Sequence, residues 1–229
     1  MKWLFDFLLR SSIGRKVVMS LSGIFLILFL IVHLLGNLQL LNDDGGMQFN
    51  LYTYFMTHNP LIKIISYVLY ATILIHSIQG VALAWTNRKA KGVKYAVGSN
   101  VNASFFAKYM IHLGVIIFIF LVIHMVQFWL QMKLGATPVV EYPGKDHPYQ
   151  DLYTPVVEAF KNPAYVVFYV FSMIVLAFHL WHGFQSAFQS LGLNHKKYNG
   201  LIHGLGMIYS VAVSAGFAIL PIYIYLTQA

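Results

Sequence analysis

The stretch from 164 to 190, AYVVFYVFSMIVLAFHLWHGFQSAFQS, contains no charged residue. An α-helix needs roughly 20 predominantly apolar residues to cross about 30 Å of hydrocarbon. This stretch and four others meet that test, and they predict membrane-spanning helices at about 17–41, 61–85, 106–131, 164–190 and 204–226. The sequence therefore predicts an all-α membrane protein, a single membrane-anchor domain over 1–229, with little chain left for a soluble domain.

The composition agrees with this class. Of the 229 residues, 59% are apolar and only 10% are charged, whereas about a quarter of the residues of a soluble domain are charged. The first span begins after Arg15 and Lys16, too deep in the chain for a cleaved export signal, so we expect it to remain in the protein. Cysteine is absent, which excludes disulfides, thiolate metal sites and covalently attached c-type haem.

Basic residues mark one side of the membrane. Lysine and arginine collect on the cytoplasmic side of membrane proteins. Of the 15 basic residues, 11 belong to the N-terminus and to the second and fourth loops: Lys2, Arg10, Arg15, Lys16, Arg88, Lys89, Lys91, Lys94, Lys108, Lys196 and Lys197. We therefore expect the N-terminus inside, and the C-terminus and the one long connection, about 132–163, outside. This clustering and the membrane lipid account for the net charge of +8, so no nucleic-acid partner is expected.

Five of the ten histidines fall well inside the predicted spans: His33, His76, His124, His179 and His182. A lone membrane histidine often only bonds a neighbouring helix, but the depths here form a pattern. At a rise of 1.5 Å per residue, His33 and His124 stand roughly 24 to 27 Å from the cytoplasmic edge, and His76 and His179 roughly 14 to 17 Å. Two stacked pairs, one histidine from each of four helices, are typical of a four-helix bundle that holds two bis-histidine b-type haems. Such iron has no open position for a substrate and passes electrons.

A short motif repeats around the inner pair. His76 and His179 each precede a glycine by four residues, in HSIQG and HLWHG. Because residues i and i+4 share a helix face, Gly80 and Gly183 are predicted to clear room for the porphyrin. His182 is an alternative ligand about 60° around the same helix, but the glycine spacing favours His179. His182 would then contact a haem edge, a propionate or a quinone, or link to the fifth span.

Several motifs follow one another in the order of a known family. They are SIGRK (12–16), HLLGN (33–37), HSIQG (76–80), IHM (123–125) and FHLWHGF (178–184) followed by Ser186, Gln189, Leu191 and Gly192. Over nearly the whole chain they resemble the cytochrome b subunit of succinate dehydrogenase and fumarate reductase, of the five-helix di-haem b558 type. The resemblance implies that His76 and His179 bind the inner haem iron, and that His33 and His124 bind the outer one. The family position that matches His182 is not a ligand.

The resemblance also implies partners. A flavoprotein subunit and an iron–sulfur subunit would join this chain at a bacterial cytoplasmic membrane, and electrons would pass between succinate and a membrane quinone, of the menaquinone type. The chain would be a subunit of that enzyme without a succinate-oxidising site of its own. Its basic inner loops would then be a candidate docking surface for the iron–sulfur subunit. Candidate contacts for haem propionates or quinone near the inner edge are Ser20, Ser22, His112, His182, Ser186, Ser190 and His203.

The sequence differs from the family in one respect, and two alternative functions stay open. Some fumarate reductases of this type place an acidic residue in the membrane near the outer haem, but no predicted span here contains Asp or Glu, so the sequence does not locate the quinone site. A cytochrome b anchor of a membrane formate dehydrogenase or hydrogenase also uses membrane histidines, in a different order. A transporter would use them as proton relays and would be colourless.

Overall fold

The computed structural model describes residues 3, 6–8, 11–90 and 105–228, and it is mostly helical. Five helices are long and apolar enough to cross a membrane: α2 (Ser12–Asn37), α4 (Pro60–Ala90), α5 (Phe105–His124), α8 (Pro163–Ser190) and α9 (Asn199–Gln228). This confirms the prediction of five apolar spanning helices. It also supports a multi-pass membrane protein.

Capping residues determine where two of these helices begin. The hydroxyl oxygen of Ser11 accepts a hydrogen bond from the backbone N–H of Gly14 at 2.9 Å, so α2 starts five residues earlier than hydropathy alone indicates. At α8, the side-chain oxygen of Asn162 accepts from the N–H of Ala164 at 3.0 Å, and Pro163 occupies the first helical turn.

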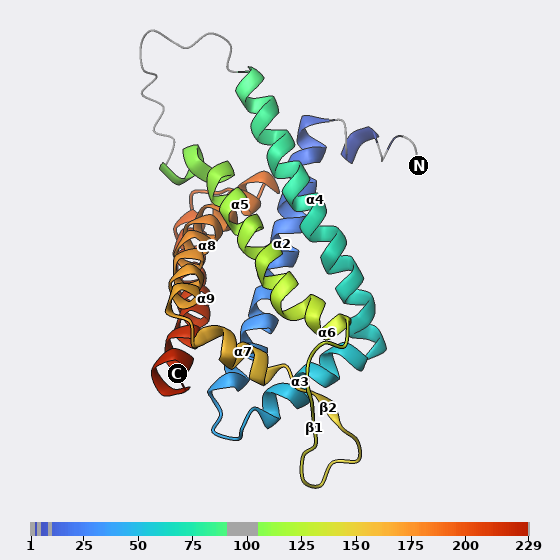
Figure 1. Ribbon diagram of the computed structural model, residues 1–229. Coiled ribbons are helices and arrows are strands. Elements are labelled where there is room, and N and C mark those ends of the chain that lie inside the picture. The colour runs from blue at the N-terminus through green and yellow to red at the C-terminus, as the bar shows by residue number, and fades with distance from the viewer. Residues whose placement is uncertain (1–2, 4–5, 9–10, 91–104, 229) are drawn as a thin grey trace.

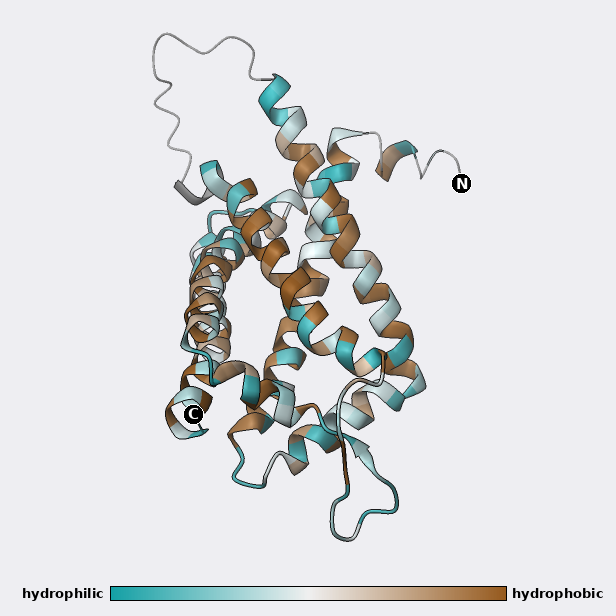
Figure 2. Ribbon diagram, in the orientation of Figure 1, coloured by the Kyte–Doolittle hydropathy of each residue, from teal (hydrophilic) through white to brown (hydrophobic). Residues whose placement is uncertain are grey.

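The long helices run side by side, and α2 begins at the end opposite to that at which α9 ends (Figure 1). Hydrophobic residues fill their middles, and hydrophilic residues collect at the ends (Figure 2). Four helices form a ring in which α2 packs against α4 and α8, and α5 packs against the same two helices. In this ring α2 lies diagonally opposite α5, and α4 lies diagonally opposite α8. Helix α9 packs along α8 and also contacts α2.

A cap of short elements closes the end at which α9 finishes (Figure 1). It contains η1 (Leu38–Leu41), α3 (Met47–His58), η2 (Met125–Leu130), α6 (Gln131–Lys133), the antiparallel strands β1 (Val139–Val140) and β2 (Tyr149–Gln150), and α7 (Tyr153–Phe160). Leu40, Phe49, Phe128 and Phe160 pack there in one buried apolar cluster. The sequence analysis expected only a long connection at 132–163 and did not predict α3.

Asn50 joins α3 to the long connection. Its side chain is 1% exposed, and its amide nitrogen donates to the hydroxyl of Tyr142 at 2.8 Å and to the carboxylate of Asp151 at 2.9 Å. Its amide oxygen accepts from the backbone N–H groups of Leu152 and Tyr153 at 3.0 and 3.1 Å. Burial alone would raise the pKa of Asp151, but its hydrogen bonds outweigh burial and lower that pKa, so the carboxylate stays charged near neutral pH.

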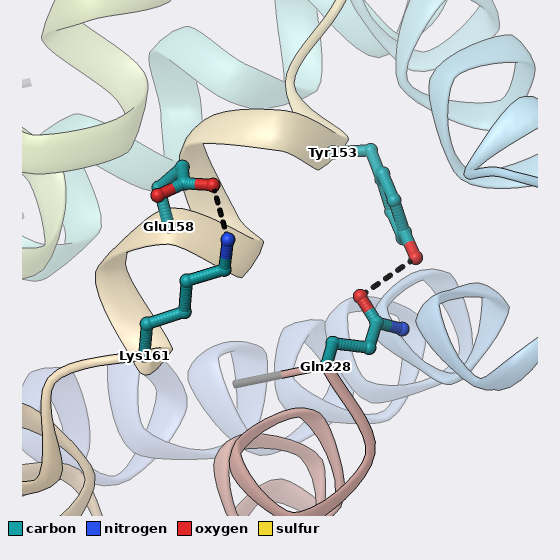
Figure 3. A network of polar contacts seen from close by, with 4 residues as sticks. All are labelled: Tyr153, Glu158, Lys161 and Gln228. Atoms are coloured by element: carbon teal, nitrogen blue, oxygen red, sulfur yellow. Dashed lines mark hydrogen bonds and ion pairs between the residues drawn. The ribbon is translucent and has the colours of Figure 1, made fainter.

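A second set of polar contacts holds α7 (Figure 3). The hydroxyl of Tyr153 donates to the side-chain oxygen of Gln228 at 3.1 Å, which ties the start of α7 to the end of α9. Lys161 and Glu158 form an ion pair of 2.7 Å along α7. Both partners of this pair are largely exposed, so we expect it to contribute little to stability.

Gly206 lies at the close contact between α9 and α8. A Cβ atom there would lie 2.9 Å from Cδ1 of Phe184, so the phenyl ring must move to admit it. We expect Gly206→Ala to lower the free energy of unfolding by roughly 1–3 kcal/mol. Gly204→Ala is the matched control, because its Cβ would meet no described atom within 4 Å and alanine favours a helix by about 1 kcal/mol. Thermal unfolding in detergent should therefore move in opposite directions for the two variants, and equal midpoints would contradict the packing.

Candidate functional site

Histidines from four long helices meet in two pairs. The ring centres of His33 on α2 and His124 on α5 are 5.9 Å apart, and those of His76 on α4 and His179 on α8 are 6.3 Å apart. Each pair therefore joins helices that lie diagonally opposite in the ring. The sequence analysis placed these same residues together by depth, and their binding of iron stays a prediction.

The spacing within each pair suits one metal ion between two imidazoles. A metal–nitrogen bond of about 2 Å on each side, plus about 1.1 Å from each nitrogen to its ring centre, gives about 6.2 Å between ring centres. The two distances in the structure lie close to this value on either side. Within the described ranges, no group of three or more His, Cys, Asp or Glu side chains is placed to hold a metal. Each pair offers two imidazoles, so a metal ion bound there would need further ligands, which a porphyrin would supply.

Ser22 holds the ring of His76 in one orientation. Nδ1 of His76 lies 3.0 Å from the hydroxyl oxygen of Ser22, and that hydroxyl donates its proton to the backbone carbonyl of Met19 at 2.9 Å. Because the hydroxyl has only one hydrogen, it must accept from Nδ1–H of His76. This tautomer leaves the lone pair on Nε2, the nitrogen that is then available to a metal.

Tyr169 also contacts a histidine of the site, with 3.3 Å between Nδ1 of His124 and the phenolic oxygen, and either atom can donate. The surroundings of the outer pair are aromatic: Phe29 stacks on His33 and Phe120 stacks on His124, each phenylalanine four residues before its histidine. A π-helical turn, η2, follows His124 directly, and such turns are frequent at functional sites. The outer pair thus combines one oriented imidazole with apolar walls that suit a flat aromatic group.

The second histidine of each pair has no such support. Nδ1 of His179 is buried and has no hydrogen-bond partner in the part of the chain that the structure describes. For His33, the described chain provides only a bond to its backbone, where the side chain of Asn37 donates to the carbonyl oxygen at 2.8 Å. Each pair therefore contains one imidazole that contacts a hydroxyl group through Nδ1 and one for which the described residues provide no such contact.

Two glycines lie directly against the inner histidines. A Cβ atom on Gly23 would be 3.4 Å from Cε1 of His76, and one on Gly114 would be 3.6 Å from Cε1 of His179. In both cases the glycine belongs to a different helix from the histidine it contacts. These glycines allow α2 and α5 to approach the rings closely.

The glycines of the repeated motif have other neighbours. A Cβ atom on Gly80 would meet the methyl group of Met19 at 3.5 Å, and one on Gly183 would meet that of Met110 at 3.7 Å. Methionine is flexible and fills irregular gaps, so these side chains are the ones that must move if a porphyrin lies beside the glycines. The clearing role of Gly80 and Gly183 stays a prediction.

Three of the predicted inner contacts, His182, Ser186 and His203, come together around one cavity of about 200 Å³. The other four lie elsewhere. Ser20 donates to its own helix at Lys16, Ser22 bonds His76, His112 is exposed beside Tyr109, and Ser190 does not line the cavity. Of the predicted basic inner surface, Lys2, Arg10, Lys91 and Lys94 lie outside the described residues.

The sequence analysis missed Tyr169 and the two glutamines of the cavity, Gln185 and Gln189. The available signal for Tyr169 was a hydroxyl near the start of a largely apolar span. Comparison with protein families, with curated proteins and with solved structures finds no match to this chain. The functional interpretation therefore depends on the site itself and on the motifs that carry the family resemblance.

Proposed function

We propose that this chain is the di-haem cytochrome b membrane anchor of a succinate:quinone oxidoreductase. The observation that supports this best is the meeting of four histidines in two diagonal pairs, with ring spacings of 5.9 and 6.3 Å. His76 and His179 would hold the inner haem b, and His33 and His124 the outer one. When bound, haem supplies one-electron transfer at an iron with no open position.

The residues of the chain have defined roles in this proposal. The paired imidazoles would bind the iron from both faces. Ser22 keeps His76 in the tautomer that presents Nε2, and with iron on Nε2 of His124 its Nδ1–H would donate to Tyr169. Phe29 and Phe120 help to exclude water from the outer pair. The chain would lie in a bacterial cytoplasmic membrane with its N-terminus inside. There it would carry electrons between an iron–sulfur subunit, itself joined to a flavoprotein, and membrane quinone.

A reduced-minus-oxidised spectrum and a pyridine haemochrome assay on the purified chain test the proposal. We expect a b-type spectrum and two haems per chain. A colourless chain would exclude the proposal and favour a transporter that uses membrane histidines as proton relays. If haem is present, quinone reduction by the purified complex with succinate, formate or hydrogen distinguishes the three kinds of cytochrome b anchor.

The hydroxyl groups of Ser22 and Tyr169 should each affect the midpoint potential of one haem. Donation from Nδ1–H makes an imidazole ligand more basic, which favours the ferric state. We expect Ser22→Ala to raise the inner midpoint potential and Tyr169→Phe to raise the outer one, each by about 30–60 mV, since 59 mV is a tenfold change for one electron. Ser22→Thr keeps a hydroxyl and should restore the inner value. Redox titration measures both potentials, and a variant that shifts both or neither would contradict these assignments.

A further inference from the structure

Arg15, near the start of α2, differs from the other basic residues of the chain. Every other lysine and arginine in the described ranges is exposed, whereas Arg15 is partly buried. Its Nε atom is fully buried and has no hydrogen-bond partner among the described residues. The positive-inside rule accounts for the exposed Lys16 beside it, but that rule requires no burial. The burial of Arg15 therefore needs another explanation.

Arg15 lies on the face of α2 that points into the ring of helices. Helix α2 is continuous, so residues 7 and 18 positions apart along it share one direction to within about 20°. Ser22 is seven residues after Arg15, and His33 is 18 residues after it. The hydroxyl of Ser22 is 3.0 Å from Nδ1 of His76, and the ring of His33 is 5.9 Å from its partner in the outer pair. Arg15 therefore shares the face that meets both histidine pairs, about two turns nearer the start of α2 than Ser22 is.

The described chain supplies no anion for this guanidinium group. None of the five long helices contains Asp or Glu, and no carboxylate of a described residue forms an ion pair or hydrogen bond with Arg15. Arg15 also stands in the first turn of α2, where the helix dipole disfavours a positive charge. A buried charge without a partner is costly. A bound oxyanion would pair with the guanidinium group and would itself be favoured by the dipole.

We propose that Arg15 binds a propionate carboxylate of the inner haem. The inference rests on the proposed function, in which His76 and His179 hold that haem, and Ser22 joins the Arg15 face of α2 to this pair. Arginine binds carboxylates through a planar fork of N–H donors that form charge-assisted hydrogen bonds. The seven inner contacts predicted from the sequence include no lysine or arginine, so Arg15 supplies the positive charge that they lack.

A phospholipid phosphate is the other source of an oxyanion at a membrane edge. The direction of Arg15 favours the propionate, because its face of α2 points into the helix ring and away from lipid. Lipid composition can distinguish the two sources, since a phosphate partner requires an anionic lipid and a propionate does not.

Redox titration of the purified full-length chain tests this role, in nanodiscs of phosphatidylcholine alone and with added phosphatidylglycerol. A positive charge beside a haem favours the reduced state, because reduction adds a negative charge. We expect Arg15→Gln to shift the inner haem about tenfold toward the oxidised state, which lowers its midpoint potential by about 59 mV. This sign is opposite to that expected for Ser22→Ala. The fall should be the same in both lipids, and Arg15→Lys should restore most of it. Lys16→Gln is the matched control, because it removes the adjacent exposed charge and should leave both potentials unchanged.

The other outcomes separate the explanations. A wild-type chain without haem overturns the proposed function and this inference together. Two haems with an unchanged inner potential in Arg15→Gln overturn only the role of Arg15, as does an equal fall in Lys16→Gln. A fall that occurs only with phosphatidylglycerol assigns Arg15 to a lipid phosphate and overturns the propionate contact. If Arg15→Gln loses the inner haem, its retention in Arg15→Lys supports the charge contact, and its loss in both variants overturns it.

Discussion

Replacing His76 by alanine is expected to reduce the haem content of the purified chain from two haems to one. The change removes one of the two imidazoles of the inner pair, whose ring centres lie 6.3 Å apart. His179→Ala should have the same effect, and the outer haem should remain in both variants. The pyridine haemochrome assay gives the haem content, and the reduced-minus-oxidised spectrum identifies the haem that is lost.

The matched control is His182→Ala, which removes an imidazole one turn along the same helix. It should keep both haems, because His182 lines the cavity at the end of α8 and has no ring contact with His76. If His182→Ala loses a haem while His179→Ala keeps two, the axial ligand of α8 has been assigned to the wrong residue.

Replacing Asn50 by leucine is expected to loosen the whole cap. The change removes four hydrogen bonds and leaves Asp151 and two backbone N–H groups without their buried partner. Because each unsatisfied buried group costs about 1–3 kcal/mol, we expect a loss of roughly 3 kcal/mol or more in the local stability of the cap. Hydrogen exchange at the amides of Leu152 and Tyr153 measures that loss directly.

The matched control for this prediction is Gln48→Leu on the same helix. Its side chain is exposed and accepts a single bond from Asn42, so the change should stay within about 0.5 kcal/mol. Equal amide protection in the two variants would mean that Asn50 does not hold the cap together.

The spanning helices could be predicted because membrane crossing is a property of local composition. Their starts were less predictable, since a capping side chain such as Ser11 extends α2 beyond its apolar core. Helix α3 was missed because its sequence, MQFNLYTYFMTH, is too short and too polar to resemble a span. Its position depends on bonds from Asn50 to residues about a hundred positions away, and no local pattern reveals such bonds.

For the candidate site, depth arithmetic indicated which histidines share a level, because the rise per residue is fixed. It did not indicate the rotation of each helix about its axis. The contacts of Ser22 with His76, of Tyr169 with His124, and of Gly114 with His179 all depend on that rotation. The HxxxG repeat drew attention to glycines on the same helix as the histidine, whereas the glycines against the rings belong to neighbouring helices.

The diagonal arrangement of the pairs has a consequence for biogenesis. A porphyrin bound between either histidine pair would link two helices that lie diagonally opposite in the bundle, whereas the main packing contacts join neighbouring helices. Helix α4 is one of the helices that would gain most from such a link, because among its described side chains only Gln79 is buried. In cells starved of porphyrin, newly made chains would therefore keep α4 loosely attached and open to membrane proteases, so that cofactor supply would regulate the amount of mature anchor.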